Sequence, residues 1–268
     1  MQLIEVPAKT GYVWFRQGIW LFRRNPLAFL TLFFTYLLAM WVISLVPIIG
    51  TVLPLAFIPG VAVGFMAACR DTVAGKQVFP TILMDGFRSY GGAAARRLVE
   101  LGGLYIAAMA VVFAGSALAD GGTLFKLMMI GGGISPEAVA GSSLPRAALI
   151  ALGCYVPVAM LFWFAPVLTV WHDVPPVKAM FFSLVSCWRN RGAFIVYAAL
   201  WFVTTMIISF GVSIAMDAIG ARAYAYTVLF PATITLMTML YCSFYATYRG
   251  CFAVQAGNGA DASKPSAG

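Results

Sequence analysis

The fold is decided by the stretch from Asn25 to Cys69, which reads NPLAFLTLFFTYLLAMWVISLVPIIGTVLPLAFIPGVAVGFMAAC. No Asp, Glu, Lys or Arg interrupts it. A transmembrane helix needs about 20 predominantly apolar residues, so this stretch is long enough for two spans. We predict span one over residues 27–46, a short turn at Pro47-Ile48-Ile49-Gly50, and span two over residues 51–69.

The rest of the chain has the same apolar character. Of its 268 residues, 62% are hydrophobic and only 10% are charged, whereas soluble domains carry about 25% charged residues. We therefore expect an all-α fold, a polytopic transmembrane helical bundle of about six spans in three hairpins. Residues 1–254 form a single transmembrane helical domain in this prediction, and the Gly-, Ala-, Ser- and Pro-rich residues 255–268 form a disordered cytoplasmic tail. The other four spans are expected at residues 98–119, 146–171, 193–215 and 223–248.

Two segments outside the spans have the pattern of amphipathic helices at the membrane interface. In residues 10–24, aromatic residues alternate with Lys9, Arg16 and Arg23, which are seven positions apart and share one helix face. We interpret this segment as an interfacial helix with its aromatic side in the acyl boundary. The alternative is an extension of span one. Residues 177–190 predict a second interfacial helix, and residues 123–130 predict a short surface helix.

The distribution of charge predicts the orientation. If the N-terminus lies inside, three of the 17 basic and three of the nine acidic residues fall in outer loops: Lys126, Arg146, Arg222, Asp120, Glu137 and Asp217. The other 14 basic and six acidic residues then lie inside. Basic residues concentrate in cytoplasmic loops, so we expect both termini in the cytoplasm. The net charge of +8 is then a topology signal, and the expected partner is the lipid bilayer and not nucleic acid.

Prolines and glycines suggest irregular helices. Pro54 and Pro59 predict that span two is kinked or partly unwound near its start, where neighbouring helices must satisfy the freed carbonyl groups. Gly60 and Gly64 have the spacing of close helix packing. The basic residues 70–97 are expected to form a loop.

A short internal repeat joins two parts of the chain. Residues 24–29 (RNPLAF) resemble residues 189–194 (RNRGAF), and each set follows an aromatic amphipathic segment and opens a span. Both copies begin on the same side of the membrane, so the repeat is parallel, whereas several transporter folds contain inverted repeats. Chance similarity is the alternative for so short a match.

Two patterns carry a resemblance to a known family. They are Pro59-Gly60, Gly64, Gly75-Lys76, Leu83 and Phe87, and then Ala165-Pro166, Pro176, Ala179-Met180, Ser183 and Arg189-Asn190. Over about residues 10–255 the chain resembles uncharacterised bacterial six-span inner-membrane proteins. These distantly resemble YciC-like proteins and the membrane domains of some glycerophosphodiester phosphodiesterases. The resemblance implies a bacterial inner (cytoplasmic) membrane and six spans, and it implies no activity.

No part of the sequence has the pattern of a catalytic or metal site. His172 is the single histidine, and one histidine does not make a zinc set. Cys154 and Cys242 lie within spans with no His or acid nearby in the sequence, as inert buried thiols do. Met237, Met239 and Cys242 suit packing better than copper ligation. We expect free cysteines, no metal, no cofactor and no enzymatic activity.

Two pairs of arginines are candidate sites for lipid head groups. They lie where each interfacial helix enters a span: Arg23 with Arg24, and Arg189 with Arg191. A guanidinium group can donate two hydrogen bonds to one phosphate. The neighbouring Trp20 and Trp188 suit the head-group level of the bilayer. We therefore predict that the two pairs hold anionic lipid. The alternative is that they only set the topology.

One carboxylate lies inside a predicted span. Glu100 is about one turn into span three, four residues after Arg96 and three after Arg97. We interpret it as a member of a helix-end salt bridge with these arginines, and a gating or coupling carboxylate is the alternative. Ion-coupled transporters usually keep further charges within their spans, and here the span interiors have none.

The sequence therefore favours a non-enzymatic integral inner-membrane protein with a scaffold or accessory role through contacts with lipids or other membrane proteins. A passive or weakly coupled transporter or channel for a small or apolar solute is the alternative, favoured by the prolines in the spans. A lipid-modifying enzyme is a third interpretation, and it lacks acid and base groups.

Overall fold

The computed structural model describes residues 2–46, 50–130 and 143–253. Within these ranges, six helices are long and apolar enough to cross a membrane. They are α2 (Pro26–Ser44), α3 (Leu53–Val73), α5 (Gly91–Asp120), α8 (Leu144–Phe162) continued by α9 (Ala165–Trp171), α11 (Arg191–Ala218) and α12 (Ala225–Cys251). The expected all-α polytopic bundle is confirmed, and each predicted span overlaps one of these helices.

Shorter elements lie between the spans. The two amphipathic segments are separate helices, α1 (Thr10–Arg24) and α10 (Pro176–Arg189). The remaining described elements are η1 (Pro80–Met84), α4 (Asp85–Arg88), α6 (Thr123–Phe125), the π-helical η2 (Lys126–Ile130), η3 (Arg222–Tyr224), β1 (Gln2–Leu3) and β2 (Phe252–Ala253). The predictions for residues 47–49, for the glycines at 131–133 and for the tail at 255–268 lie outside the described residues.

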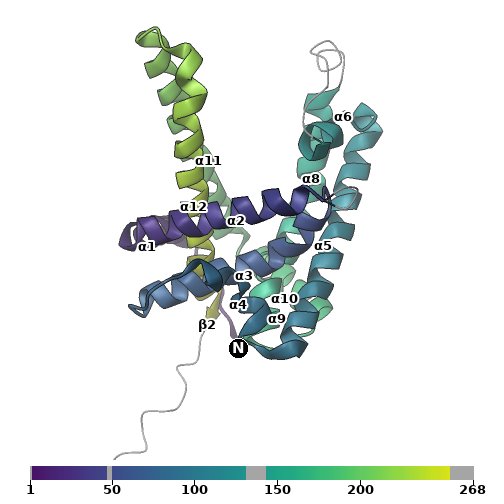
Figure 1. Ribbon diagram of the computed structural model, residues 1–268. Coiled ribbons are helices and arrows are strands. Elements are labelled where there is room, and N and C mark those ends of the chain that lie inside the picture. Colours follow the sequence, from purple (N-terminus) through teal and green to yellow (C-terminus); the bar gives the residue numbers. More distant parts are fainter. Residues whose placement is uncertain (1, 47–49, 131–142, 254–268) are drawn as a thin grey trace, which may run out of the picture.

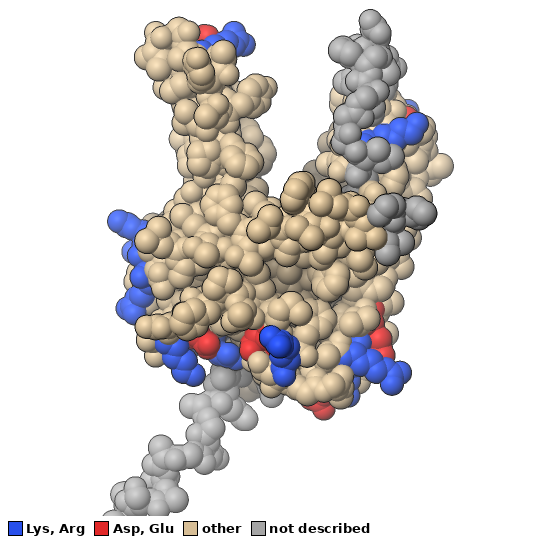
Figure 2. Space-filling view, in the orientation of Figure 1, with Lys and Arg blue, Asp and Glu red and all other residues tan. Residues whose placement is uncertain are grey.

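Two hairpins project from the rest of the molecule. Figure 1 shows α11 with α12 as one hairpin and α5 with α8 as the other, and α3, α9 and α10 pack near their base. In Figure 2, charged side chains lie along the lower and left edges and at the two tips, and the surface between them is almost free of charge. An apolar surface between charged ends is what a bilayer requires.

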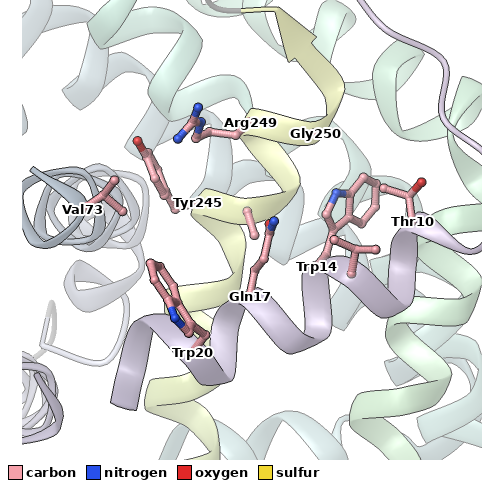
Figure 3. Close-up of a pocket in the computed structure, with 10 residues that line it drawn as sticks. Thr10, Trp14, Gln17, Trp20, Val73, Tyr245, Arg249 and Gly250 are labelled. Atoms are coloured by element: carbon pink, nitrogen blue, oxygen red, sulfur yellow. The ribbon is translucent and has the colours of Figure 1, made fainter. Parts of the chain in front are cut away.

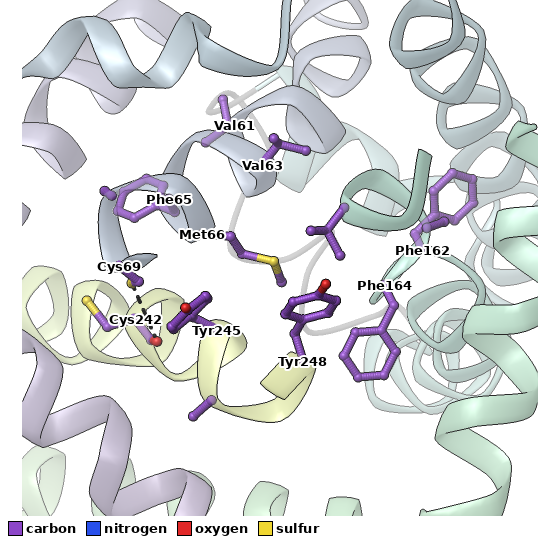
Figure 4. Close-up of a cluster of buried hydrophobic side chains, with 14 of the residues drawn as sticks. Val61, Val63, Phe65, Met66, Cys69, Phe162, Phe164, Cys242, Tyr245 and Tyr248 are labelled. Carbon is purple, nitrogen blue, oxygen red and sulfur yellow. Dashed lines mark hydrogen bonds between the residues drawn. The ribbon is translucent and has the colours of Figure 1, made fainter. Parts of the chain in front are cut away.

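The most buried span is α3. Its most apolar stretch is 56% buried, against 17–33% for the other five spans. Val63, Phe65 and Met66 are almost completely buried, and Figure 4 shows them beside aromatic residues of α12. The Phe65 ring lies 4.8 Å from that of Tyr241. Close packing of this kind stabilises helices in lipid, where burial of apolar surface provides little driving force.

Span four is broken at Trp163 and Phe164, between α8 and α9. Pro166 lies in the first turn of α9, where its missing N–H would have had no partner in the helix. The buried hydroxyl of Ser183 on α10 bonds to backbone groups on both sides of the break. It accepts a hydrogen bond from the Phe164 N–H at 2.9 Å and donates to the Met160 carbonyl at 2.7 Å. These bonds satisfy backbone groups that lipid cannot satisfy.

Partial unwinding of span two is wrong for the described residues, and a kink stays a prediction. α3 is one continuous helix with Pro54 in its first turn and Pro59 in its interior. Pro54 removes no helical hydrogen bond, because the first N–H groups have no partner within the helix. Pro59 leaves the Leu55 carbonyl without its helical donor, and the helix nevertheless continues through it. The break therefore falls in span four and not in span two.

The loop expected over residues 70–97 is wrong in its bounds, because α3 continues to Val73 and α5 begins at Gly91. η1 and α4 fold back against α3, where a Cβ at Gly64 would lie 2.6 Å from the Leu83 Cα and one at Gly60 would lie 2.3 Å from the Phe87 ring. Gly60 and Gly64 therefore allow the close approach of η1 and α4, and not of another span. Leu83 and Phe87 supply the apolar contacts that hold η1 and α4 against α3.

α1 packs on the bundle through two glycines. A Cβ at Gly11 would lie 2.2 Å from the Ala193 carbonyl oxygen on α11, and one at Gly18 would lie 2.3 Å from the Ser243 Cβ on α12. Trp14, between the glycines, is 1% exposed. The prediction that the aromatic side of this segment lies in the acyl boundary is therefore wrong for Trp14, because small residues let this face approach α11 and α12 closely.

The two ends of the described chain lie together. β1 pairs antiparallel with β2, and the Ile4 N–H donates to the Cys251 carbonyl at 2.9 Å. The Asn190 side chain accepts from the Val6 N–H at 2.8 Å and donates to the Ile4 carbonyl at 3.1 Å. Both ends therefore lie on one side of the molecule, and their cytoplasmic location stays a prediction from charge.

Candidate functional site

The end of α1 presents the first arginine pair. Asn25 leaves the helical conformation (φ −151°, ψ 67°) and ends α1, and its side chain accepts from the Ala28 N–H at 3.4 Å to open α2. Arg23 and Arg24 are exposed, and neither forms an ion pair within 4.0 Å with a carboxylate of the described residues. The Arg24 guanidinium lies over the Trp20 ring, 4.4 Å from its centroid.

The junction of α10 and α11 presents the second pair. Arg189 forms an exposed ion pair with Glu5, at 2.7 Å between Nε and Oε1. Arg191 lies over the exposed Trp188 ring, 5.7 Å from its centroid, and donates to the Trp188 carbonyl at 3.3 Å. An exposed ion pair contributes only about 0–1 kcal/mol, so a phosphate can compete with Glu5 for Arg189.

The two arginine pairs lie at separate places. The start of α1 is close to the second pair, because a Cβ at Gly192 would lie 3.4 Å from the Ala8 Cβ. α1 is 15 residues long, so its other end is about 22 Å away. The structure therefore offers two sites at opposite ends of α1.

Glu100 and its expected partners form two separate pairs. Arg96 donates to Glu100 at 3.1 Å between Nε and Oε1, and both side chains are well exposed. Arg97 instead bonds Asp173, through the carboxylate and, at 3.0 Å, the backbone carbonyl. The prediction that Arg97 also pairs with Glu100 is wrong, because the α9–α10 connection brings a nearer acceptor to it.

A pocket of about 550 Å³ opens where α1 crosses α12 near the end of α3 (Figure 3). Gln17 on α1 and Arg249 on α12 supply polar groups, and Trp14 and Tyr245 supply buried aromatic surface. Arg249 and Gln17 could not be paired from the sequence, because they are far apart along the chain. The spacing of Gly11 and Gly18 was the available signal, since it marks the face of α1 that another helix approaches.

Polar side chains also meet where α3, α9 and α12 end. Arg70 donates to the Tyr90 hydroxyl at 2.7 Å and to Asp71 at 3.0 Å. Nε2 of His172 lies 2.6 Å from the Tyr248 hydroxyl. Burial lowers the pKa of His172 from its ordinary value, since it disfavours the charged ring. The single histidine is therefore a neutral hydrogen-bonding group at neutral pH.

The cysteines lie apart from any catalytic partner in the described chain. All five are free thiols, and the Cys69 thiol donates to the Cys242 carbonyl at 3.7 Å. Burial raises the pKa of Cys187, which keeps this thiol protonated and weakly reactive. Over the ranges that the structure describes, no group of three or more His, Cys, Asp or Glu side chains is placed to hold a metal ion.

A comparison with known proteins gives the family. The chain is 69% identical over 257 residues to a probable inner membrane protein of Burkholderia thailandensis, and the match covers 95% of each chain. The chain belongs to the family of this inner membrane protein. No family model and no solved structure matches the sequence.

Membership in this inner-membrane family agrees with the six apolar helices. The chain is therefore a multi-pass protein of a bacterial inner membrane. The more distant likeness to YciC-like proteins and to phosphodiesterase membrane domains stays a prediction.

Proposed function

We propose that this inner-membrane protein is a non-enzymatic scaffold or accessory protein, which holds anionic lipid at the cytoplasmic surface and works through contacts with lipids or other membrane proteins. One observation carries the proposal. Arg23 and Arg24 end α1 without a carboxylate partner among the described residues, and Trp20 lies under Arg24.

Anionic lipid suits this arrangement for three physical reasons. Two positive charges at the last positions of α1 have no carboxylate partner among the described residues, so they attract a phosphate. Each basic residue near an anionic membrane surface contributes about 1 kcal/mol to binding. An indole ring such as that of Trp20 prefers the head-group level, which fixes the depth of the arginines. Arg191 over Trp188 repeats the arrangement at the other end of α1.

Exposed apolar helix faces support the membrane-partner part of the proposal. The outer half of α11 exposes large side chains on the projecting hairpin, each by 63–68%: Ile207, Phe210 and Ile214. In a bilayer such a face contacts acyl chains or the helices of another protein. A role through contacts needs surface of this kind and no reactive group.

The non-enzymatic part of the proposal is supported by the placement of the reactive side chains. His172 bonds Tyr248 and has no described cysteine or carboxylate as a hydrogen-bond partner. We expect His172→Ala, Cys154→Ala and Cys242→Ala to change any activity of the purified protein by no more than a few-fold. Removal of a true catalytic group costs about 100-fold or more, and such a loss in folded protein would contradict the proposal.

The hollow between the two hairpins favours a second candidate function. Figure 2 shows the molecule hollowed between the projecting α11–α12 and α5–α8 hairpins, which suits a passive or weakly coupled transporter for a small or apolar solute. Efflux of such solutes from proteoliposomes tests this candidate. Release no faster than from protein-free vesicles would exclude it for the solutes used.

A thermal-shift experiment on the purified full-length protein tests the proposed function. Added cardiolipin or phosphatidylglycerol should raise the Tm of the wild type, whereas phosphatidylcholine should not. The quadruple variant Arg23→Gln, Arg24→Gln, Arg189→Gln and Arg191→Gln should lose most of the gain, because both arginine pairs are gone.

A charge-matched control separates a site from general attraction. The double variant Arg23→Gln, Arg24→Gln should lose part of the gain, and its control is Lys76→Gln, Arg88→Gln, which also removes two charges but does so away from α1. This control should keep the wild-type gain from anionic lipid. If the quadruple variant inserts normally and gains as much from lipid as wild type, the arginines only set topology.

A further inference from the structure

The pocket between α1 and α12 is cationic at its mouth and aromatic at its floor. Figure 3 shows Arg249 and Gln17 on facing helices, with Thr10 and Trp20 at the two ends of the α1 wall and Trp14 between them. Both Arg249 and Gln17 are exposed, and Trp14 and Tyr245 are buried. The described residues that line the pocket include no Asp or Glu. The site therefore offers hydrogen-bond donors and one full positive charge to a ligand.

The floor is formed by close packing of α1 on α12. Nε1 of Trp14 is buried and forms no hydrogen bond with the described residues. Gly250 lets the indole pack directly against the α12 backbone, since a Cβ there would lie 2.2 Å from Nε1. The indole therefore closes the floor, and the donors that a ligand can reach are those of Arg249 and Gln17.

The pocket continues into the first arginine pair. Val13, Gln17, Trp20 and Arg24 are spaced at three and four residues, so they lie along one face of α1. Trp20 lines the pocket and also lies under the Arg24 guanidinium. A ligand in the pocket thus has Arg249 on one side and Arg24 beyond Trp20 on the other.

We infer that this pocket binds a phosphate group, presented by a phospholipid head group or by a soluble phosphate. Arg249 donates to the phosphate oxygens, Gln17 provides a neutral donor, and Trp20 covers the adjoining apolar part of the ligand. Charge-assisted bonds from arginine are the strong ones in such a site. Binding of a phospholipid head group in this pocket rests on the proposed function, whereas binding of a soluble phosphate does not.

Calorimetric titration of the purified full-length protein tests the inference. The probes are inorganic phosphate, dihexanoyl phosphatidic acid below its micellar concentration, and dihexanoyl phosphatidylcholine. The variants are Arg249→Gln and the control Arg16→Gln, which removes an exposed charge from α1 outside the pocket. Arg249→Gln should weaken phosphatidic acid binding at least about tenfold, whereas Arg16→Gln should change it less than about twofold.

Each outcome decides one part of the inference. Binding of phosphatidic acid but not of inorganic phosphate identifies a lipid site, and equal loss of both probes in Arg249→Gln identifies a general phosphate site. Equal effects of Arg249→Gln and Arg16→Gln would overturn the inference, because the pocket would then add nothing to surface charge.

The test also separates this inference from the proposed function. If Arg249→Gln keeps full affinity while the quadruple arginine variant loses lipid stabilisation, the proposed function stands and the pocket fails. If wild type binds inorganic phosphate through Arg249 but gains no stability from anionic lipid, the pocket stands and the lipid role fails.

Discussion

Asn190 accepts a hydrogen bond from the backbone N–H of Val6 at 2.8 Å, across 184 positions of sequence. The same side chain donates to the Ile4 carbonyl and to the Ser186 carbonyl, and Asn190 is 1% exposed. A single buried amide thus joins the N-terminal segment to the start of α11.

Asn190→Ala should loosen this N-terminal segment. The substitution leaves the Val6 N–H and the Ile4 carbonyl without their partner, at a cost of about 1–3 kcal/mol. Hydrogen exchange should therefore become faster at residues 4–6. Asn25→Ala is the control, because Asn25 makes only a local 3.4 Å bond to Ala28, and it should leave exchange at residues 4–6 unchanged. Unchanged exchange in Asn190→Ala would mean that β1 alone holds the segment.

Two adjacent glycines on α5 give a matched pair of substitutions. A Cβ at Gly102 would lie 2.3 Å from the Ala56 carbonyl oxygen on α3, whereas one at Gly103 meets nothing within 4 Å. Gly102→Ala should lower the Tm because α5 must move away from α3. Gly103→Ala should leave it unchanged or raise it slightly, since Ala favours helix by up to about 1 kcal/mol. Equal Tm shifts would show that α3 and α5 are not in close contact.

The break in span four depends on Ser183. Ser183→Ala should destabilise the protein by about 1–3 kcal/mol, because the Phe164 N–H and the Met160 carbonyl lose their partner in a lipid environment. Ser186→Ala on the same helix is the control. Its hydroxyl donates only to the Phe182 carbonyl of its own helix, so the change in the free energy of unfolding should be smaller. Urea titration in mild detergent measures the free energy of unfolding of both variants. Equal changes would mean that the Ser183 hydroxyl does not stabilise the break between α8 and α9.

The helix bounds could be predicted from the sequence because lipid allows few choices. Every charged residue must lie near a span end, so the absence of charge between Asn25 and Cys69 fixed two helices within a few residues. Partners of side chains could not be predicted in this way. Arg97 has Glu100 three residues away, yet it bonds Asp173, because the fold brings that residue closer.

The candidate site, like the fold, could be predicted from the sequence only in part. The exposed Arg24 beside Trp20 could be predicted, since both belong to one helix turn. The pocket could not, because Gln17 and Arg249 meet only when α1 crosses α12. The hydrophobic pattern predicted that the aromatic face of α1 lies in lipid. Gly11 and Gly18 instead allow that face to pack on α11 and α12.

The topology stays a prediction that cysteine labelling checks. In a Cys-less background, a cysteine at Tyr226, exposed at the start of α12, should react with an impermeant maleimide added from the periplasm. A cysteine at Lys76 should react only after the membrane is opened. The positive-inside distribution is the physical reason. The opposite labelling pattern would contradict the cytoplasmic placement of the termini.

His172 should make stability depend on pH on the acid side. Burial holds its pKa in the folded protein below the ordinary value of 6.5. The folded state therefore binds a proton less readily than the unfolded chain does. Above pH 6.5 the ring is neutral in both states and its contribution to stability is fully present. Below pH 6.5 the unfolded state binds more protons, so the free energy of unfolding falls as pH falls toward the folded pKa.

His172→Gln removes this titration and keeps a hydrogen-bonding group near the Tyr248 hydroxyl. The Tm of wild type should therefore fall more steeply than that of the variant between pH 6.5 and about pH 5, above the range in which ordinary carboxylates titrate. Measuring Tm against pH in one detergent compares the two slopes directly. Parallel curves would show that the ring takes up its proton as easily in the folded protein as in the unfolded chain.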